Sequence, residues 1–240
     1  MRWIQRLAAR DDVVKVTAGL AVASLVLANA ACGGGSLGSL APAPDPDGAV
    51  EQARSQNPFP ATSLVIFGWR LREPNLRLEG MGYARLQNPD RARLDLFMEN
   101  NESVLMASLV EDQLRAREGT QLEVVPSPAL LWASLGVFRP GAGATRVRAE
   151  SYAGDAFRLT YLLEDGDELR YELRSGQMVE VELRHDGDAV HRVTLTRDGG
   201  AELPREATYR NLATFSELKV TVESVERVDS HPSDIWYSVQ

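Results

Sequence analysis

The chain has 240 residues and a formal net charge of −8 at pH 7, with 26 basic and 34 acidic side chains. This acidic balance argues against nucleic acid as a partner, because phosphate binding requires clustered lysine and arginine. The single cysteine excludes an internal disulfide, so the folded part must be stabilised by its own apolar core.

The first 31 residues have the features of a signal peptide, which is set aside from fold reasoning. Four basic side chains lie ahead of an uncharged apolar run over residues 16–27. That run is too short for a bilayer core of about 30 Å, which takes about 20 apolar residues to cross. The small residues Ala28, Ala30 and Ala31 then lead directly to Cys32 and suit a signal-peptidase groove.

The segment Ala28-Asn29-Ala30-Ala31-Cys32 resembles the lipobox of bacterial lipoproteins, although that family favours Leu where this chain has Asn29. The resemblance implies that Cys32 is acylated and becomes the new N-terminus. Gly33 after it, in place of Asp, implies sorting to the outer membrane. Two alternatives stay open, namely cleavage at an ordinary A-x-A site that releases a soluble protein, and an uncleaved membrane anchor.

Residues 33–48 (GGGSLGSLAPAPDPDG) are too poor in large apolar side chains to fold. We predict that residues 32–48 form a lipidated cysteine and a flexible tether. A tether is useful when its first residue is fixed to something, so its presence favours lipidation of Cys32. Residues 32–240 carry 22 basic and 32 acidic side chains, a net charge of −10, because residues 1–31 hold four basic and two acidic ones. Residues 49–240 are long enough for one domain with a substantial core.

The later part of the chain shows the period-two alternation of strands that have one buried and one solvated face. The alternation is regular around Leu169, Tyr171 and Leu173, and a Ser175-Gly176 pair then predicts a tight hairpin. We expect four consecutive strands joined by short turns, an antiparallel meander, at residues 157–163, 168–174, 177–184 and 190–197.

The earlier part and the C-terminal part have the same character. We expect strands at residues 64–72, 76–87, 91–98, 103–110, 113–118 and 215–228. The apolar phase slips near Gly80 and Gly82, which predicts a bulge or a sharp bend, and it slips again at Ser224. Long strands with such bends favour a strongly curved antiparallel sheet.

Helical content is expected to be small. Residues 49–56 suit a short helix, and residues 127–135 suit a second one, with Ser127 as a cap and Pro128 in the first turn. This second helix ends at Gly136 and carries apolar side chains that must pack on the sheet or close its opening. The fold class is therefore mainly β (α+β).

The order of these segments resembles the LolA/LolB-like group of bacterial periplasmic carriers and lipoproteins. The points of likeness are GWRLREP followed by LRLEGMGYARLQNPDRARLDLFM, the pair SVLMASLVEDQLRAREG, the helix PSPALLWASLG, the meander, and the closing ELPREATYRN, LKVTVESVERVD and IWY. The resemblance implies an incompletely closed antiparallel β-barrel over residues 49–240. A short helical lid would cover an apolar cavity that accepts lipid or acyl chains, in a protein that helps deliver lipoproteins to the outer membrane.

Candidate cavity residues follow from this architecture, although each is individually also compatible with a plain core. Two tryptophans, Trp69 and Trp132, suit either the rim of the cavity or the core. The candidates for the cavity wall are Leu94, Leu96, Met98, Leu159 and Tyr161, and those for the lid are Leu130, Leu131 and Leu135.

Patterns that resemble catalytic or metal sites do not fit their surroundings. Residues 34–38 (GGSLG) match G-x-S-x-G, but a nucleophile elbow requires a strand-to-helix turn and these residues lie in the tether. His185, His191 and His231 lack metal-ligand spacing with nearby carboxylates. We therefore expect no catalytic residue, no metal and no cofactor, in a protein that is not an enzyme.

The leading hypothesis is a lipid-anchored envelope protein, facing the periplasm from the outer membrane, that binds acyl chains or lipoproteins in an apolar cavity. The alternative is a structural or assembly lipoprotein without a cavity, which binds another envelope protein through its sheet edge or helix. A hydrolase is a more distant third.

Overall fold

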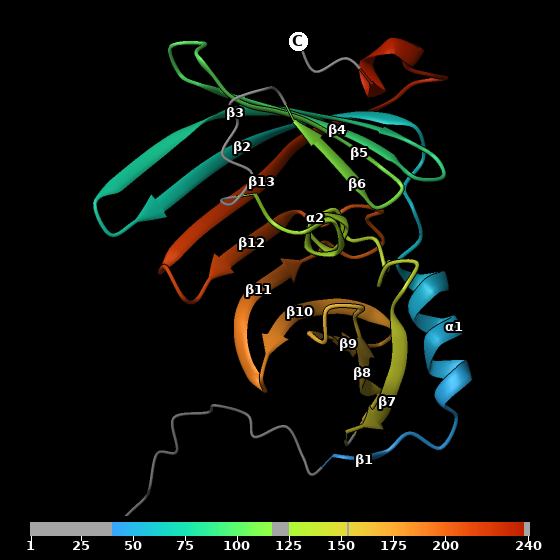
Figure 1. The fold of residues 1–240 in the computed structure, drawn as a ribbon. Helices are drawn as coiled ribbons and strands as arrows, with labels where there is room; N and C mark the ends of the chain where they lie inside the picture. The colour runs from blue at the N-terminus through green and yellow to red at the C-terminus, as the bar shows by residue number, and fades with distance from the viewer. Residues whose placement is uncertain (1–39, 117–124, 153, 238–240) are drawn as a thin grey trace, which may run out of the picture. The chain divides into compact units, whose positions relative to one another are not determined.

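The computed structural model describes residues 40–116, 125–152 and 154–237. All described helices and strands belong to one compact unit, residues 37–240, which carries its own apolar cores (Figure 1). This unit is therefore expected to fold without the residues that precede it. Among its described helices, none has the length and hydropathy needed to span a bilayer.

The described residues of this unit form thirteen strands, two α-helices and a C-terminal 3₁₀ turn, η2 (Ser233–Trp236). The helices are α1 (Pro46–Gln56) and α2 (Pro128–Ser134). The strands are β1 (Ala41–Pro42), β2 (Ser63–Glu73), β3 (Leu76–Gln87), β4 (Arg91–Met98), β5 (Ser103–Val110), β6 (Gln113–Ala116), β7 (Thr145–Ser151), β8 (Ala156–Leu162), β9 (Glu168–Arg174), β10 (Gln177–His185), β11 (Asp188–Thr196), β12 (Glu206–Asn211) and β13 (Ser216–Arg227).

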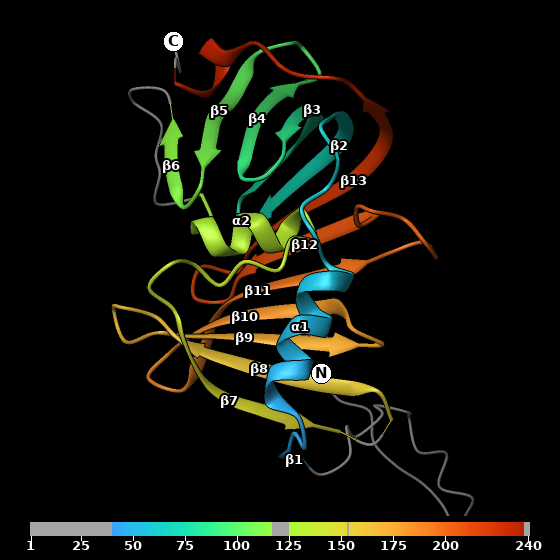
Figure 2. The ribbon, with the colours of Figure 1, turned by 90° about the vertical axis from the view of Figure 1, so that its right-hand side faces the viewer.

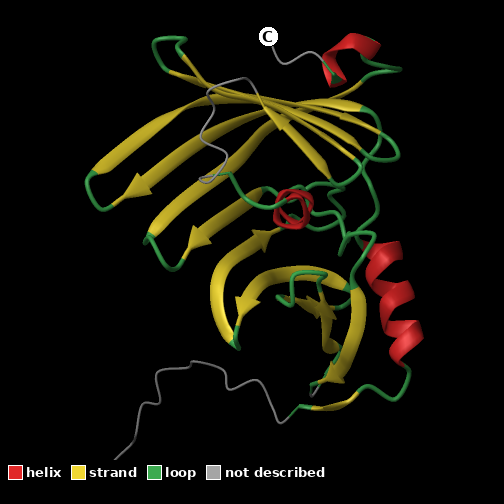
Figure 3. Cartoon of the chain, viewed as in Figure 1, coloured by secondary structure: helices red, strands yellow, loops and turns green. Residues whose placement is uncertain are grey.

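All thirteen strands form one antiparallel sheet in the order β1-β7-β8-β9-β10-β11-β12-β13-β2-β3-β4-β5-β6. The sheet curls strongly, yet its end strands β1 and β6 are not paired with each other (Figures 1 and 3). The barrel is therefore incompletely closed. The predicted fold class, a curved antiparallel sheet with a short helix, is confirmed.

Register shifts within the sheet accompany its curvature. The β13–β2 ladder shifts between Val222 and Ser224, which confirms the phase slip predicted there. Of the bulge or sharp bend predicted near Gly80 and Gly82, the bulge is excluded, because β3 pairs in continuous register with both β2 and β4. The glycines serve close approach instead: a Cβ on Gly82 would lie 2.3 Å from the Phe67 ring.

The meander β8–β11 is present as predicted, with short connections between its strands. Ser175 and Gly176 both have positive φ, 50° and 78°, and connect the paired residues Arg174 and Gln177. Two residues of positive φ form the turn that matches the twist of antiparallel strands. The β9–β10 hairpin is therefore closed in the way that the Ser-Gly pair predicts.

Three strands were not expected from the sequence, namely β1, β7 and β12. The described elements also begin earlier than the domain boundary predicted at residue 49. Ala41 and Pro42 pair with β7, and α1 begins at Pro46 because the Asp45 side chain accepts a hydrogen bond from the Gly48 N–H at 2.9 Å. Part of the predicted tether thus belongs to the folded unit.

Two apolar cores lie on the concave side of the sheet. The first fills the meander half, where α1 contributes Val50 and Ala53 at helical spacing and packs against β7 and β10 (Figure 2). The second lies between β2–β5, β13 and α2, with Trp69 and Trp132 among its members. Helix α2 separates the two cores, since Leu130 belongs to the first and Leu131 to the second.

Candidate functional site

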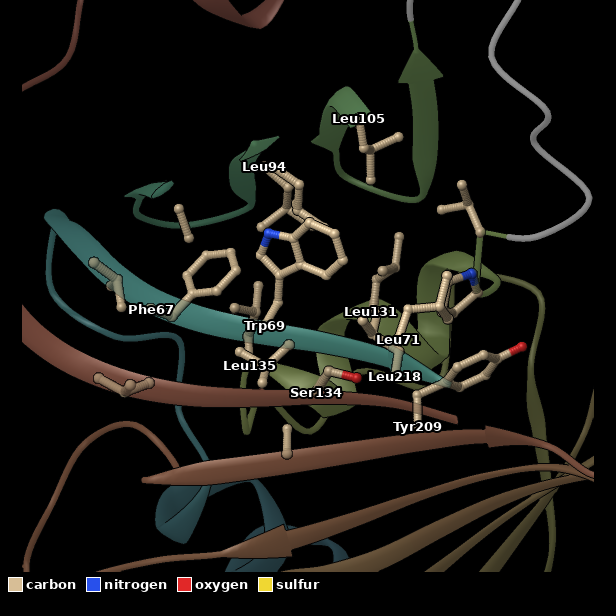
Figure 4. A pocket seen from close by; sticks show the side chains of 18 of the residues that line it. Phe67, Trp69, Leu71, Leu94, Leu105, Leu131, Ser134, Leu135, Tyr209 and Leu218 are labelled. Atoms are coloured by element: carbon tan, nitrogen blue, oxygen red, sulfur yellow. The ribbon is translucent and has the colours of Figure 1, made fainter. Parts of the chain in front are cut away.

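An apolar pocket of about 480 Å³ lies in the second core, between the sheet and α2. Strand β2 forms one wall, from which Phe67, Trp69 and Leu71 project into the pocket (Figure 4). The remaining lining residues are Val65, Glu73, Ala84, Leu94, Leu96, Val104, Leu105, Val125, Pro126, Leu131, Ser134, Leu135, Leu203, Pro204, Ala207, Tyr209, Ser216, Leu218, Val220 and Val222.

The pocket exists because the two halves of the sheet are filled differently. In the meander half, α1, α2 and Phe138 supply side chains that occupy the concave surface. In the other half, α2 is the described helix that faces the sheet, and its Leu131 and Leu135 reach only part of the space. Small side chains at Ala84 and Ala207 widen the remaining volume, which lies within the range of about 300–1,000 Å³ typical of ligand pockets.

Trp69 is fixed in the pocket wall by its polar edge. The side chain is almost fully buried, and its Nε1 lies 3.1 Å from the carbonyl oxygens of both Met81 and Phe97. Because these backbone acceptors satisfy the indole N–H, the rest of the ring is free to present an apolar surface to the pocket.

Few polar groups face the pocket, and they divide between two places. Ser134 lies on α2, and its hydroxyl donates to the Leu130 carbonyl at 2.8 Å. Glu73 and Ser216 lie where β2 ends and where β13 begins, so the polar rim is at the ends of these strands. Val104, which is 40 % exposed, also lines the pocket. The accessible end of the pocket is therefore the one near Glu73, Ser216 and Val104.

Tyr209 contributes an aromatic ring to the pocket while its hydroxyl is bonded elsewhere. Tyr209 Oη lies 2.9 Å from His191 Nδ1. Burial raises the pKa of Tyr209 to about 12 and lowers the pKa of His191, so the phenol keeps its proton and the imidazole stays neutral near pH 7. Both partners are then uncharged, so the pocket gains no charge from this pair.

The structure brings four of the predicted cavity residues together. Leu94 and Leu96 of β4 line the pocket from the sheet, and Leu131 and Leu135 line it from α2. Met98 packs against the same core without lining the pocket.

Three other predicted residues lie in the meander core. Leu130, Leu159 and Tyr161 pack with α1 and Phe138, and Tyr161 contacts the Phe138 ring edge-on with centroids 6.1 Å apart. They do not line the pocket. Alternation along a strand identifies residues on the concave face, but α1 fills one part of that face and leaves the other part open.

Helix α2 forms a fixed wall of the pocket. Leu130, Trp132 and Ala133 have no exposed surface, and Trp132 Nε1 donates to the Glu111 carbonyl at 2.8 Å. The helix covers one side of the pocket, as predicted, and displacing it would disrupt both cores. Ser127 is the N-cap residue of α2, but its side chain makes no capping hydrogen bond.

Most of the β2 and β13 lining was not singled out from the sequence. Phe67, Trp69 and Leu71 alternate along a predicted strand, as do Leu218 and Val220. That alternation identifies one face of each strand. The missing information was that β2 and β13 pair with each other, so that the apolar face of each strand borders the same pocket.

Cys32 lies outside the described residues. Within the described residues, no three His, Cys, Asp or Glu side chains gather closely enough to hold a metal ion.

No protein-family model and no curated protein sequence matches the chain. Solved structures match its fold. A LolA superfamily protein from Nitrosomonas europaea aligns with a TM-score of 0.56 at 11 % identity, covering 82 % of this chain and 99 % of the other. A domain described as an outer membrane lipoprotein-sorting protein, from Vibrio parahaemolyticus, aligns with a TM-score of 0.52 at 8 % identity, covering 79 % of this chain and 95 % of the other. The chain therefore has the LolA/LolB-like fold.

Proposed function

We propose that this protein binds acyl chains, free or attached to lipoproteins, in the apolar pocket. The observation that carries the proposal is the pocket itself, whose lining is almost wholly aliphatic and aromatic. Burying an acyl chain there is favourable by about 0.8 kcal/mol per methylene group. The role is binding and transfer without catalysis, with no metal or cofactor.

Entry of the ligand takes place at the rim near Glu73, Ser216 and Val104. The lining residues at this end are the more exposed ones, whereas α2 is packed on both sides. The binding step then requires no displacement of α2. This end is also the place where a head group that cannot enter an apolar pocket would remain in contact with water.

A lipid on Cys32 would hold the protein at the outer membrane, facing the periplasm. The support for this location is the small-residue segment before Cys32 and the Gly33 that follows it. Two or more acyl chains would give stable anchoring where a single chain would not. The partners are then the bilayer that holds the anchor, the acylated cargo and other envelope proteins.

Filling the pocket should abolish acyl binding. In purified residues 37–240, Ala84→Phe places an aromatic ring in the space that a ligand would occupy. Excluding two methylene groups costs about 1.6 kcal/mol of binding free energy, so we expect binding of a fluorescent fatty acid to weaken more than tenfold.

The matched control is Ala84→Ser, which changes the same position without filling the pocket and should bind nearly as the parent does. Ala207→Phe blocks the pocket from β12 and provides a second, independent test. Native mass spectrometry on the parent would show whether lipid co-purifies. A folded parent that retains no lipid and binds no fatty acid would contradict the proposal and favour the structural lipoprotein.

Anchoring has a separate test. Cys32→Ala removes the only thiol that a lipid can modify, so the full-length variant should move from the membrane fraction to the soluble periplasmic fraction. Fractionation with an antibody against residues 37–240 measures this change. Continued membrane retention of Cys32→Ala protein from which the cell has cleaved the signal peptide would contradict lipidation.

A further inference from the structure

Four neighbouring strands carry a row of charged side chains on the face opposite the pocket. The register aligns Arg210 of β12 with Glu217 of β13, Glu217 with Arg72 of β2, and Arg72 with Arg77 of β3. Alternate positions, such as Leu71, line the pocket. Because successive side chains of a strand point to opposite faces, the three arginines lie together on the outer face.

The arginines of this row are only partly neutralised. Glu217 is shared, with Arg210 Nε at 2.8 Å and an Arg72 nitrogen at 3.9 Å. Arg77 is exposed and, among the described residues, forms no ion pair. Surface ion pairs of this kind contribute little, so the guanidinium groups stay available to a competing anion. In a chain of net charge −8, this local excess of positive charge stands out.

Two exposed apolar side chains lie at the adjoining hairpin turns. Phe215, in the turn between β12 and β13, is 81 % exposed, and Leu76, where β3 begins, is 42 % exposed. Since Glu217 pairs with Arg72, the β12–β13 and β2–β3 turns lie at the same end of the sheet (Figure 1). Phe215 also has φ of +57°, a backbone conformation that is unfavourable for a bulky side chain.

The same two turns border the accessible end of the pocket. Glu73 directly precedes the β2–β3 turn and Ser216 directly follows Phe215, and both line the pocket. Whatever surface the turns contact therefore faces the entrance used by the ligand.

We propose that Arg72, Arg77, Arg210, Leu76 and Phe215 form a docking surface for an anionic phospholipid bilayer. Phe215 and Leu76 would enter the headgroup region, as exposed apolar side chains do at a bilayer interface. The three guanidinium groups would hydrogen-bond lipid phosphates, which they match in geometry. Docking in this way turns the pocket entrance toward the lipids, so that an acyl chain passes between bilayer and pocket without crossing water.

Vesicle binding tests the docking surface directly and does not require a cargo. Purified residues 37–240, which lack the anchor, should bind vesicles of equal parts phosphatidylglycerol and phosphatidylcholine, and bind vesicles of phosphatidylcholine alone at least tenfold more weakly. Phe215→Asn replaces the aromatic side chain with one that tolerates positive φ, and it should weaken vesicle binding about tenfold. Arg77→Glu should weaken it about tenfold on the anionic vesicles only, and less at high salt.

The matched control is Leu162→Asn, at an exposed leucine of β8 with 41 % exposure, which should bind as the parent does. Thermal unfolding confirms that each variant is folded. Absence of binding to anionic vesicles, equal binding to both vesicle types, or unchanged binding of Phe215→Asn or Arg77→Glu would overturn the proposal. Fatty-acid binding measured on the same variants without vesicles separates a failed docking surface from a failed pocket.

Discussion

Replacing Asn57 with alanine should lower the free energy of unfolding of residues 37–240 by about 3–5 kcal/mol, since each buried group left without a hydrogen bond costs about 1–3 kcal/mol. Asn57 is 1 % exposed and follows α1. Its Nδ2 donates to the Ala53 and Gly176 carbonyls, both at 2.8 Å, and its Oδ1 accepts from the Met178 N–H at 2.9 Å. One side chain therefore joins α1 to the β9–β10 turn.

Urea unfolding followed by circular dichroism measures this loss. The control is Ser55→Ala, in the same helix, whose exposed hydroxyl bonds only the Gln52 carbonyl and whose loss should cost less than about 0.5 kcal/mol. A change below about 1 kcal/mol for Asn57→Ala would contradict the prediction, because it would mean that water replaces the lost amide. Fatty-acid binding should persist in whatever fraction is folded, since Asn57 does not line the pocket.

Trp132→Ala should cost a similar amount, about 3–5 kcal/mol, and should also weaken acyl binding. The indole is fully buried, packs edge-on against Phe59 with centroids 5.4 Å apart, and donates to the Glu111 carbonyl. Trp132 does not line the pocket, but it fixes the helix that carries Leu131 and Leu135. Its loss frees that wall to move into the pocket.

The informative comparison is Trp132→Phe, which keeps most of the apolar contact and loses the hydrogen bond, at a cost of about 1–2 kcal/mol. We expect this variant to retain fatty-acid affinity within a few-fold, whereas Trp132→Ala should bind fatty acid more weakly. Both affinities are measured well below the melting temperature, where the variants are folded. If both variants bound fatty acid as the parent does, α2 would not be positioned by Trp132. The two measurements, unfolding and binding, separate a positioning role from a contribution to stability alone.

Strands with strict alternation and defined turns could be predicted closely. The β9–β10 hairpin is located almost to the residue, because Leu169, Tyr171 and Leu173 alternate and the Ser175-Gly176 pair permits only a tight turn. Strand β7 escaped prediction because polar side chains dominate it and its apolar Val147 is exposed. Strand β12 is short and follows a turn, so its alternation of Ala207 and Tyr209 was too brief to identify.

The site was predictable only in part, for a physical reason. Leu94 and Leu159 have the same kind of strand environment in the sequence, but one lines the pocket and the other lies in a filled core. The difference arises from α1, which reaches the meander half through Val50 and Ala53. Which half of a curved sheet a distant helix covers depends on chain geometry over the whole domain. Local periodicity carries no such information.

The pairing of β2 with β13 has a consequence for how the pocket is completed during folding. Ser63 pairs with Arg227, so the ladder joins the first long strand of the sheet to the last. A chain that emerges amino terminus first, from a ribosome or a translocon, must leave β2 unpaired along this edge until β13 has also emerged. Such non-local pairing is slow, and an unpaired apolar strand invites aggregation. We therefore expect the protein to depend on a holding chaperone during biogenesis, and its pocket to be complete only when its last strand is in place.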